Sequence, residues 1–170
     1  TMLPELSKYE AENSWQRAYL DSFIEKGWPS SKNEEWKFTS LSGLFEKPFV
    51  LASKPEGDIR VNNGVTDEEV YRIVFRNGIF DAKLSDNGNP HVVVTNLFDD
   101  DEALQSLNQS QLNHHPIFNL TLGVMKSAVL IDVSVAPADK TPFIELSFTG
   151  GLFQQSAHPV IMIRVAEEAR

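Results

Sequence analysis

Two short runs of the sequence carry side chains that could bind a cation or move a proton. Asp99, Asp100, Asp101 and Glu102 are consecutive carboxylates, and hard cations prefer several carboxylate oxygens. Apolar residues follow at helical spacing, and acidic residues are favoured in the first turn of a helix. We therefore predict a helix cap at this run, with a cation-dependent hydrolase as the alternative.

The histidines do not form a recognisable ligand set. His114 and His115 are adjacent, and neighbouring side chains point about 100° apart on a helix and to opposite faces of a strand. Pro116 predicts a helix start, with His115 close to its amino end. The buried face of that helix is predicted to consist of Ile117, Leu120, Thr121, Val124 and Met125. His91 and His158 are isolated in the sequence, each beside a proline.

The chain has no cysteine, which removes disulfides, thiol nucleophiles and thiolate metal sites. No Gly-rich phosphate loop, nucleophile elbow, zinc-binding helix motif or dinucleotide fingerprint is present. We therefore expect no enzyme activity. We identify no catalytic, cofactor-binding or metal-binding residue.

Composition narrows the class of partner. A chain of 170 residues with 41% hydrophobic and 23% charged residues is typical of a globular protein. The formal net charge of −9 argues against nucleic acid and an anionic membrane surface as partners. No apolar run reaches the length of a membrane span, and no signal peptide opens the chain. We expect a cytoplasmic protein.

The first part of the chain is predicted to be helical. Residues 3–26 indicate one amphipathic helix or two shorter ones, because Trp15, Tyr19 and Phe23 recur at four-residue spacing. Asn13 and Ser14 could interrupt the pattern and cap the second part. Gly27 and Pro29 end it.

An aromatic connector follows at residues 27–41. It carries Trp28, Trp36 and Phe38 among charged residues, and we expect these rings to be buried. They either pin the connector to its own domain or form a docking surface for a partner. A short helical turn is predicted near Leu41 and Leu44.

The rest of the chain is predicted to be mixed, and we divide the protein into a helical region, 1–66, and a mixed α/β region, 67–170. Residues 52–64 are turn-rich, and Thr66 to Glu69 have capping-box spacing. A hairpin is predicted over residues 71–80 around Asn77-Gly78, and a short strand at 91–94. Strand patterns recur at 129–133, 143–148 and 160–165, which are compatible with a sandwich, a barrel or a β-solenoid. The predicted fold class is α+β.

Two motifs carry a family resemblance. The connector reads Gly27-Trp28-Pro29, Asn33-Glu34, Trp36-Lys37-Phe38-Thr39 and Leu41, and the run Arg72–Phe80 is followed by Leu84-Ser85-Asp86. Together they resemble the amino-terminal portion of SufD in the SufB/SufD family of iron–sulfur cluster assembly proteins. Ser40 departs from the pattern, because the family commonly has proline there. The resemblance implies a helical region followed by the opening coils of a right-handed parallel β-helix.

The resemblance also implies a function. The family works with a SufB-like protein and a SufC-like ATPase in a complex that assembles iron–sulfur clusters. Without cysteine, this segment would serve as scaffold and hold no cluster itself. Glu35, Trp36 and Lys37 are then candidates for a partner contact. A β-helix ending near Arg170 would lack a cap, so we expect a truncated chain. The alternative is a stand-alone α+β module that binds a peptide or a sugar.

Overall fold

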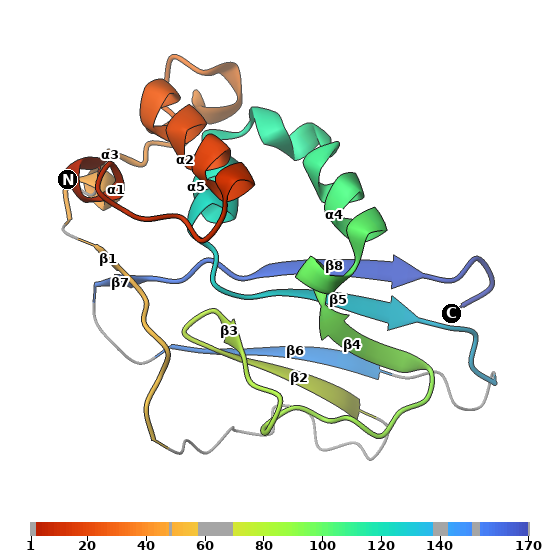
Figure 1. Cartoon of the computed structure of the whole chain (residues 1–170). Helices are drawn as coiled ribbons and strands as arrows, with labels where there is room; N and C mark the ends of the chain where they lie inside the picture. The colour runs from red at the N-terminus through yellow and green to blue at the C-terminus, as the bar shows by residue number, and fades with distance from the viewer. Residues whose placement is uncertain (1–2, 48, 58–69, 138–142, 151–153, 170) are drawn as a thin grey trace. The chain divides into compact units, whose positions relative to one another are not determined.

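The structure of the protein is a computed structural model that describes residues 3–47, 49–57, 70–137, 143–150 and 154–169. Figure 1 shows the described helices and strands in chain order. They are α1 (Leu3–Leu6), α2 (Ser14–Lys26), α3 (Ser42–Phe45), β1 (Val50–Leu51), β2 (Val70–Arg76), β3 (Ile79–Phe80), β4 (Val92–Asn96), α4 (Asp101–Asn108), α5 (Pro116–Val124), β5 (Ala128–Val133), β6 (Phe143–Thr149), β7 (Gln155–Ser156) and β8 (Val160–Val165). The α+β class predicted from the sequence is confirmed.

The chain forms two compact units, each assembled from separate segments. The helical unit takes residues 1–52, 107–125 and 152–158, and the two-sheet unit takes residues 53–106, 126–151 and 159–170. The predicted division at residue 66 and the predicted capping box at Thr66 to Glu69 lie outside the described residues. Much of the predicted turn-rich segment 52–64 lies outside them as well.

Helix α2 begins and ends where the sequence predicts. The Asn13 side chain accepts a hydrogen bond from the Gln16 backbone N–H at 2.9 Å, which makes Asn13 the N-cap. At the other end, Gly27 has φ +71°, and its N–H donates to the Phe23 carbonyl. Because a side chain is strained at such a φ, glycine suits this position.

The buried face of α2 differs from the predicted aromatic stripe. Gln16, Leu20 and Phe23 are buried, whereas Trp15 and Tyr19 are only partly buried and pack edge-to-face with centroids 6.0 Å apart. An α-helix has 3.6 residues per turn, so residues four apart lie at gradually changing angles around its surface. The predicted stripe therefore lies beside the face that is buried.

Helix α5 packs against α2 in the helical unit. Pro116 occupies its first turn as predicted, and Leu120 and Val124 join Leu6, Leu20 and Phe23 in one apolar core. Two side chains on the predicted face, those of Ile117 and Thr121, are only partly buried. The observed buried face instead includes Asn119, Leu122 and Gly123. The side-chain amide of Gln16 in α2 links the two helices by donating hydrogen bonds to the carbonyls of Leu122 at 3.2 Å and Met125 at 3.0 Å.

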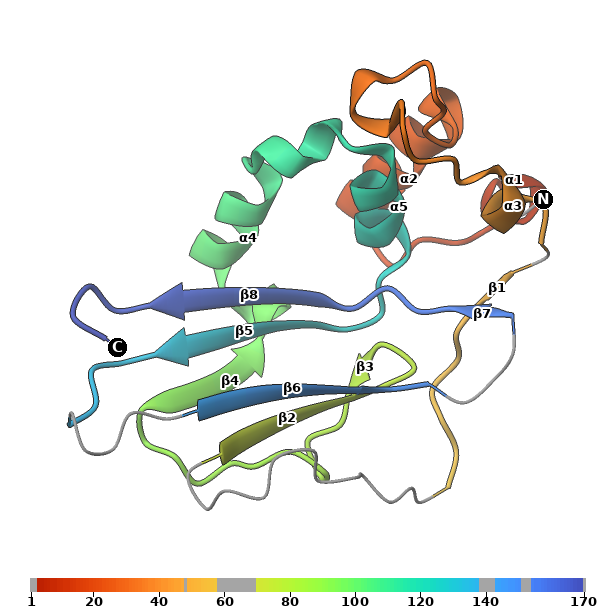
Figure 2. The same ribbon diagram turned by 180° about the vertical axis from the view of Figure 1, so that it is seen from behind.

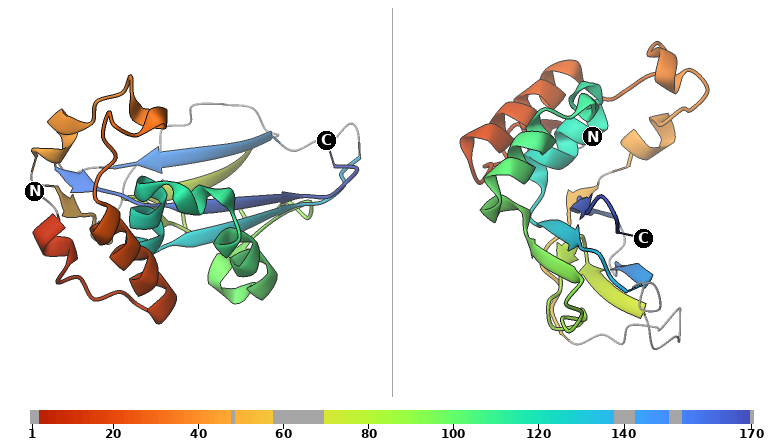
Figure 3. Two further views of the ribbon diagram at one scale, coloured as in Figure 1. Left: turned by 90° about the horizontal axis from the view of Figure 1, so that it is seen from above. Right: turned by 90° about the vertical axis from the view of Figure 1, so that its right-hand side faces the viewer.

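Among the residues that the structure describes, the two-sheet unit holds two three-stranded sheets, with strand orders β3-β2-β6 and β4-β5-β8. β6 runs parallel to β2 over Val70↔Phe143 to Arg76↔Thr149, and β8 runs parallel to β5 over Ala128↔Val160 to Val133↔Val165. Figures 2 and 3 show β6 and β8 on the same side of their parallel partners. A further short parallel pair, β1 with β7, belongs to the helical unit.

The inner faces of the two sheets share one apolar core. Its buried members are Tyr71, Ile73, Phe75, Val92, Val129 and Ile131. The predicted hairpin is confirmed, because β2 pairs antiparallel with β3 and both Asn77 (φ +50°) and Gly78 (φ +78°) have the positive φ of a type I′ turn. The first strand of this hairpin is β2, and Val74 and Arg76 on its other face are buried as well.

Candidate functional site

The aromatic connector is anchored at its start. The Trp28 ring packs edge-to-face on buried Phe23, with centroids 4.9 Å apart, and Pro29 is buried. Trp28 thereby joins the apolar core of the helical unit. For this part, the prediction that the connector rings pack against their own domain is confirmed.

The tip of the connector projects a different set of side chains. Glu34 to Trp36 form a 3₁₀ turn, preceded by a local turn in which the Asn33 side chain accepts from the Ser30 N–H at 2.9 Å. Trp36 is partly buried, but Phe38 is 93% exposed, which contradicts the expected burial of this ring. The sequence pattern missed this because aromatic content says nothing about which rings find a neighbour.

The three predicted contact residues lie together on this tip. Glu35 and Lys37 are exposed on either side of Trp36, and the Lys37 ammonium lies 5.6 Å from the centre of the Phe38 ring. Glu35 also reaches His115, with 3.2 Å between its carboxylate and the imidazole Nδ1. The tip is therefore a small mixed surface of one apolar ring and charges of both signs.

The acidic run acts as the predicted helix cap. The Asp100 carboxylate accepts a hydrogen bond from the Ala103 N–H at 2.8 Å, and this bond, with the Arg164 guanidinium nearby, lowers the pKa of Asp100. Arg164 bridges Asp100 and its cross-strand partner Asp132. Among the residues that the structure describes, no three His, Asp or Glu side chains are arranged to hold a metal ion.

His158, isolated in the sequence, is paired on both ring nitrogens. Nδ1 lies 3.1 Å from the Thr121 hydroxyl of α5, and Nε2 lies 2.5 Å from the Ser156 hydroxyl of β7. Burial lowers the pKa of His158 to about 4, so the ring is neutral at pH 7. One nitrogen then donates and the other accepts, and the ring ties a helix to a strand of the same unit. Thr121 is 37 residues away in the sequence, so spacing gave no signal for this partner, whereas Ser156 is only two residues from His158.

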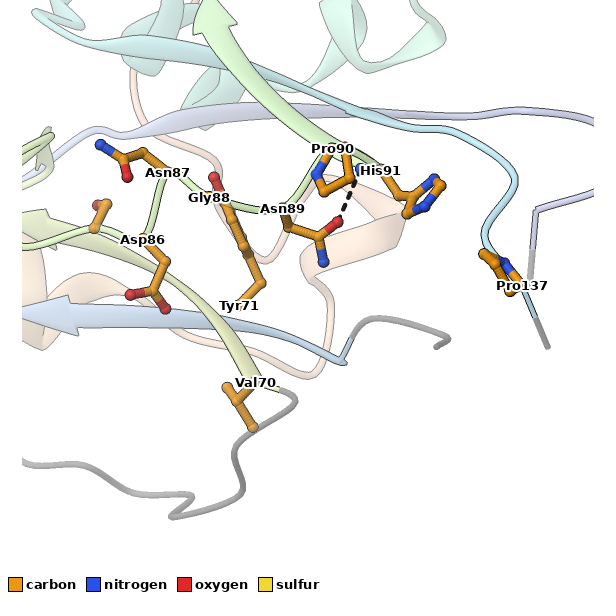
Figure 4. Close-up of a pocket in the computed structure, with 10 residues that line it drawn as sticks. Val70, Tyr71, Asp86, Asn87, Gly88, Asn89, Pro90, His91 and Pro137 are labelled. Carbon is orange, nitrogen blue, oxygen red and sulfur yellow. Dashed lines mark hydrogen bonds between the residues drawn. The ribbon is translucent and has the colours of Figure 1, made fainter. Parts of the chain in front are cut away.

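A polar pocket of about 720 Å³ opens in the two-sheet unit. It lies between the first residues of β2, Val70 and Tyr71, and the turn that carries Asp86, Asn87, Gly88, Asn89, Pro90 and His91 (Figure 4). Burial, followed by the nearby Asp86 charge, raises the pKa of the Tyr71 phenol. The sequence analysis identified no site at residues 86–91. Turn residues give no advance sign that they line a cavity.

Part of the pocket wall serves the fold. The Asp86 carboxylate accepts from the Arg72 N–H at 2.7 Å, and the Asn89 side chain accepts from the His91 N–H at 2.8 Å. The first bond holds the turn against β2, and the second stabilises the turn itself. What the pocket offers a ligand is a set of amide and carboxylate groups on an ordered turn, suited to hydrogen bonding.

Comparison with known proteins gives one distant similarity. No protein-family model matches the chain. The chain is 27% identical over 149 residues to the iron-sulfur cluster assembly protein SufD of Escherichia coli strain K12. The match covers 85% of this chain and 34% of that protein, so the chain spans about a third of its length. The similarity is SufD-like and agrees with the resemblance carried by the two sequence motifs.

No helix in the described part of the chain is both long and apolar enough to cross a bilayer.

Proposed function

We propose that the chain is the amino-terminal part of a SufD-like scaffold in a complex that assembles iron–sulfur clusters. The similarity to SufD across 85% of the chain carries this proposal. The chain acts in the cytoplasm through contacts with SufB-like and SufC-like proteins. It has no catalytic role and no cofactor of its own, in keeping with a sequence devoid of cysteine.

In this proposal the parallel strands are the opening coils of a right-handed β-helix. Support comes from the pairing of the last three strands, β6, β7 and β8, each of which runs parallel to an earlier strand. Parallel stacking of successive strands in register is the arrangement by which solenoids extend. The inserted α4 and α5 lie in the chain between β4 and β5.

The partner contact is assigned to the connector tip. Glu35, Trp36 and Lys37 are presented on an ordered turn whose base is held in the core by Trp28. An exposed aromatic ring beside a lysine, as at Phe38 and Lys37, offers both apolar area and charge to a partner.

Affinity co-purification tests the function. The complete gene product, tagged and co-expressed with the SufB-like and SufC-like proteins of its own source, should elute with both. Replacing Trp36→Ala together with Lys37→Glu should reduce co-elution, whereas Lys8→Glu, an exposed charge on the same unit, should not. A complete product that elutes alone would contradict the scaffold role. Equal loss with both variants would contradict the connector assignment.

A second candidate function is a stand-alone α+β module that binds a sugar or a peptide. The pocket beside Tyr71 favours it, because amide and carboxylate side chains on an ordered turn suit a hydroxylated ligand. Saturation-transfer NMR with a panel of sugars and short peptides tests it, with Asn87→Ala as the pocket variant. Absence of transfer for every compound at millimolar concentration would remove this candidate.

A further inference from the structure

The sequence contains the dipeptide Asn-Gly three times, and the structure gives two of these pairs contrasting surroundings. They are Asn77-Gly78, in the turn between β2 and β3, and Asn87-Gly88, in the wall of the polar pocket. The third pair, Asn63-Gly64, lies outside the described residues. An asparagine followed by glycine is chemically labile, because glycine has no side chain to shield its backbone nitrogen from the neighbouring side-chain amide.

Asn77 is held through both its backbone and its side chain. Its backbone N–H donates to the Thr149 carbonyl at 2.8 Å, and its side-chain amide donates to the Ser53 carbonyl at 3.2 Å. The positive φ of Asn77 and Gly78 fixes the pair in a type I′ turn. For the Gly78 nitrogen to reach the side-chain carbonyl carbon of Asn77, this turn has to open and the bonds have to break.

Asn87 has none of these restraints within the described part of the chain. Its side chain is exposed, makes no hydrogen bond there, and points away from the side chains of Asp86 and Asn89 (Figure 4). The backbone N–H of Gly88 has no acceptor among the described residues either. Gly88 lies outside the helices and strands, and a Cβ built on it would meet no atom within 4 Å. The Gly88 nitrogen is therefore accessible to the Asn87 amide carbon.

The next asparagine in the same turn provides an internal comparison. Asn89 is followed by Pro90, whose backbone nitrogen carries no hydrogen and cannot act as the nucleophile. The Asn89 side chain also accepts a hydrogen bond from the His91 N–H at 2.8 Å. Two asparagines of one turn therefore differ both in the nucleophile beside them and in the freedom of their side chains.

We propose that Asn87 is a site of spontaneous deamidation in the folded protein. The Gly88 nitrogen loses its proton to solvent and attacks the side-chain carbonyl carbon of Asn87. The bond from this carbon to Nδ2 breaks, and Nδ2 takes up a proton and leaves as ammonia. One water molecule then opens the cyclic imide at either carbonyl, which gives aspartate or isoaspartate at position 87. The net reaction consumes water, releases ammonia and needs no enzyme or cofactor.

The modification changes the wall of the polar pocket. Either product places a second carboxylate beside Asp86, and isoaspartate also lengthens the backbone of the turn by one methylene group. The Asp86 carboxylate holds this turn to β2 through the Arg72 N–H at 2.7 Å, so the new charge arises next to a bond that supports the pocket. This inference concerns the chemistry of the chain and does not depend on the proposed function.

Peptide mapping by mass spectrometry tests the proposal on the unmodified protein. In mildly alkaline buffer, which favours loss of the Gly88 proton, Asn87 should deamidate about tenfold or more faster than Asn77, because Asn77 reacts only when its turn opens. Asn89 should stay unchanged. Protein isoaspartate methyltransferase should label position 87, since only the cyclic-imide route gives isoaspartate. Aspartate without isoaspartate would overturn the proposed route.

A glycine variant and a denaturant separate the effect of structure from that of sequence. Gly88→Ala adds a methyl group beside the attacking nitrogen in open space, and should slow deamidation at Asn87 by about tenfold without changing Asn77. In concentrated urea, Asn77 and Asn87 should react at similar rates because the turn no longer protects Asn77. The proposal would be overturned by a native protein in which Asn87 is stable or Asn77 reacts as fast. A preference for Asn87 that persists in urea, or an unchanged rate in Gly88→Ala, would also overturn it.

Discussion

The helical unit and the two-sheet unit close their cores by different means. In the helical unit, α2 and α5 satisfy their own backbone hydrogen bonds, and side chains alone join them: Leu20 meets Gly123, and Gln16 covers the carbonyls at the end of α5. In the two-sheet unit, each strand depends on a neighbour for both backbone and side-chain contacts. Two helices can therefore complete a core through side-chain contacts alone, whereas the edge strand of a sheet still has unpaired backbone groups.

Within the two-sheet unit, the largest effect is expected at Phe75 and Phe148, whose rings stack but differ in burial. Phe75→Ala should lower the free energy of unfolding by about 3–5 kcal/mol, because a buried aromatic ring is deleted. Phe148→Ala, at 55% exposure, should cost about 1 kcal/mol. Urea denaturation measures both. Equal losses would show that the two rings contribute equally to the core.

Acid should weaken the helical unit through His158. Its pKa is about 4 in the folded protein, against about 6.5 for an ordinary histidine, so only the unfolded state binds the proton between these values. Stability should therefore fall as the pH drops from 6.5 to 4, by roughly 3 kcal/mol in total from this group.

The matched comparison for this effect is His158→Asn, which cannot titrate. The difference in unfolding free energy between the parent and His158→Asn should depend on pH within that window, while the carboxylates common to both cancel. Hydrogen exchange should show α5 losing protection before β2, since His158 contacts Thr121 of α5. A difference that stays constant from pH 7 to pH 4 would contradict the buried neutral imidazole.

Because α2 and α5 approach each other closely, one methyl group added at their contact should lower the free energy of unfolding. A Cβ at Gly123 would lie 2.8 Å from the Leu20 Cβ and 2.9 Å from its backbone nitrogen, so the helices would have to move apart. Gly123→Ala should destabilise the protein by about 2 kcal/mol in thermal or urea unfolding. Gly43→Ala in α3, with open space at its Cβ, is the control and should be neutral or slightly stabilising. Similar effects of the two would mean that the helices do not meet at Gly123.

The smallest effect concerns the start of α2. Asn13→Ala removes the N-cap acceptor and should cost about 1 kcal/mol. Asn13→Asp keeps the cap but loses the Asn13 amide that donates to the Gln16 side chain at 2.9 Å. Its loss should therefore be smaller than that of the alanine variant. Equal loss would indicate that orienting Gln16, and not capping, is the role of Asn13.

Local signals in the sequence determined much of the fold. The Asn13 cap, the Pro116 helix start, the Asn77-Gly78 turn and the strands near 129, 143 and 160 all follow from preferences of a few neighbouring residues. The functional hypothesis also came from the sequence alone, through the absence of cysteine and the two SufD-like motifs.

Tertiary structure alone decided which faces are buried and which groups meet. The periodicity of the sequence indicated that α2 is amphipathic, but it placed Trp15 and Tyr19, and not Gln16, on the buried face. Which face is buried depends on where α5 lies. It gave no sign that Phe38 is exposed, or that His158 lies between two hydroxyls. Parallel pairing joins strands 73 residues apart in β2 and β6. Such contacts depend on the path of the whole chain, whereas caps and turns depend only on adjacent residues.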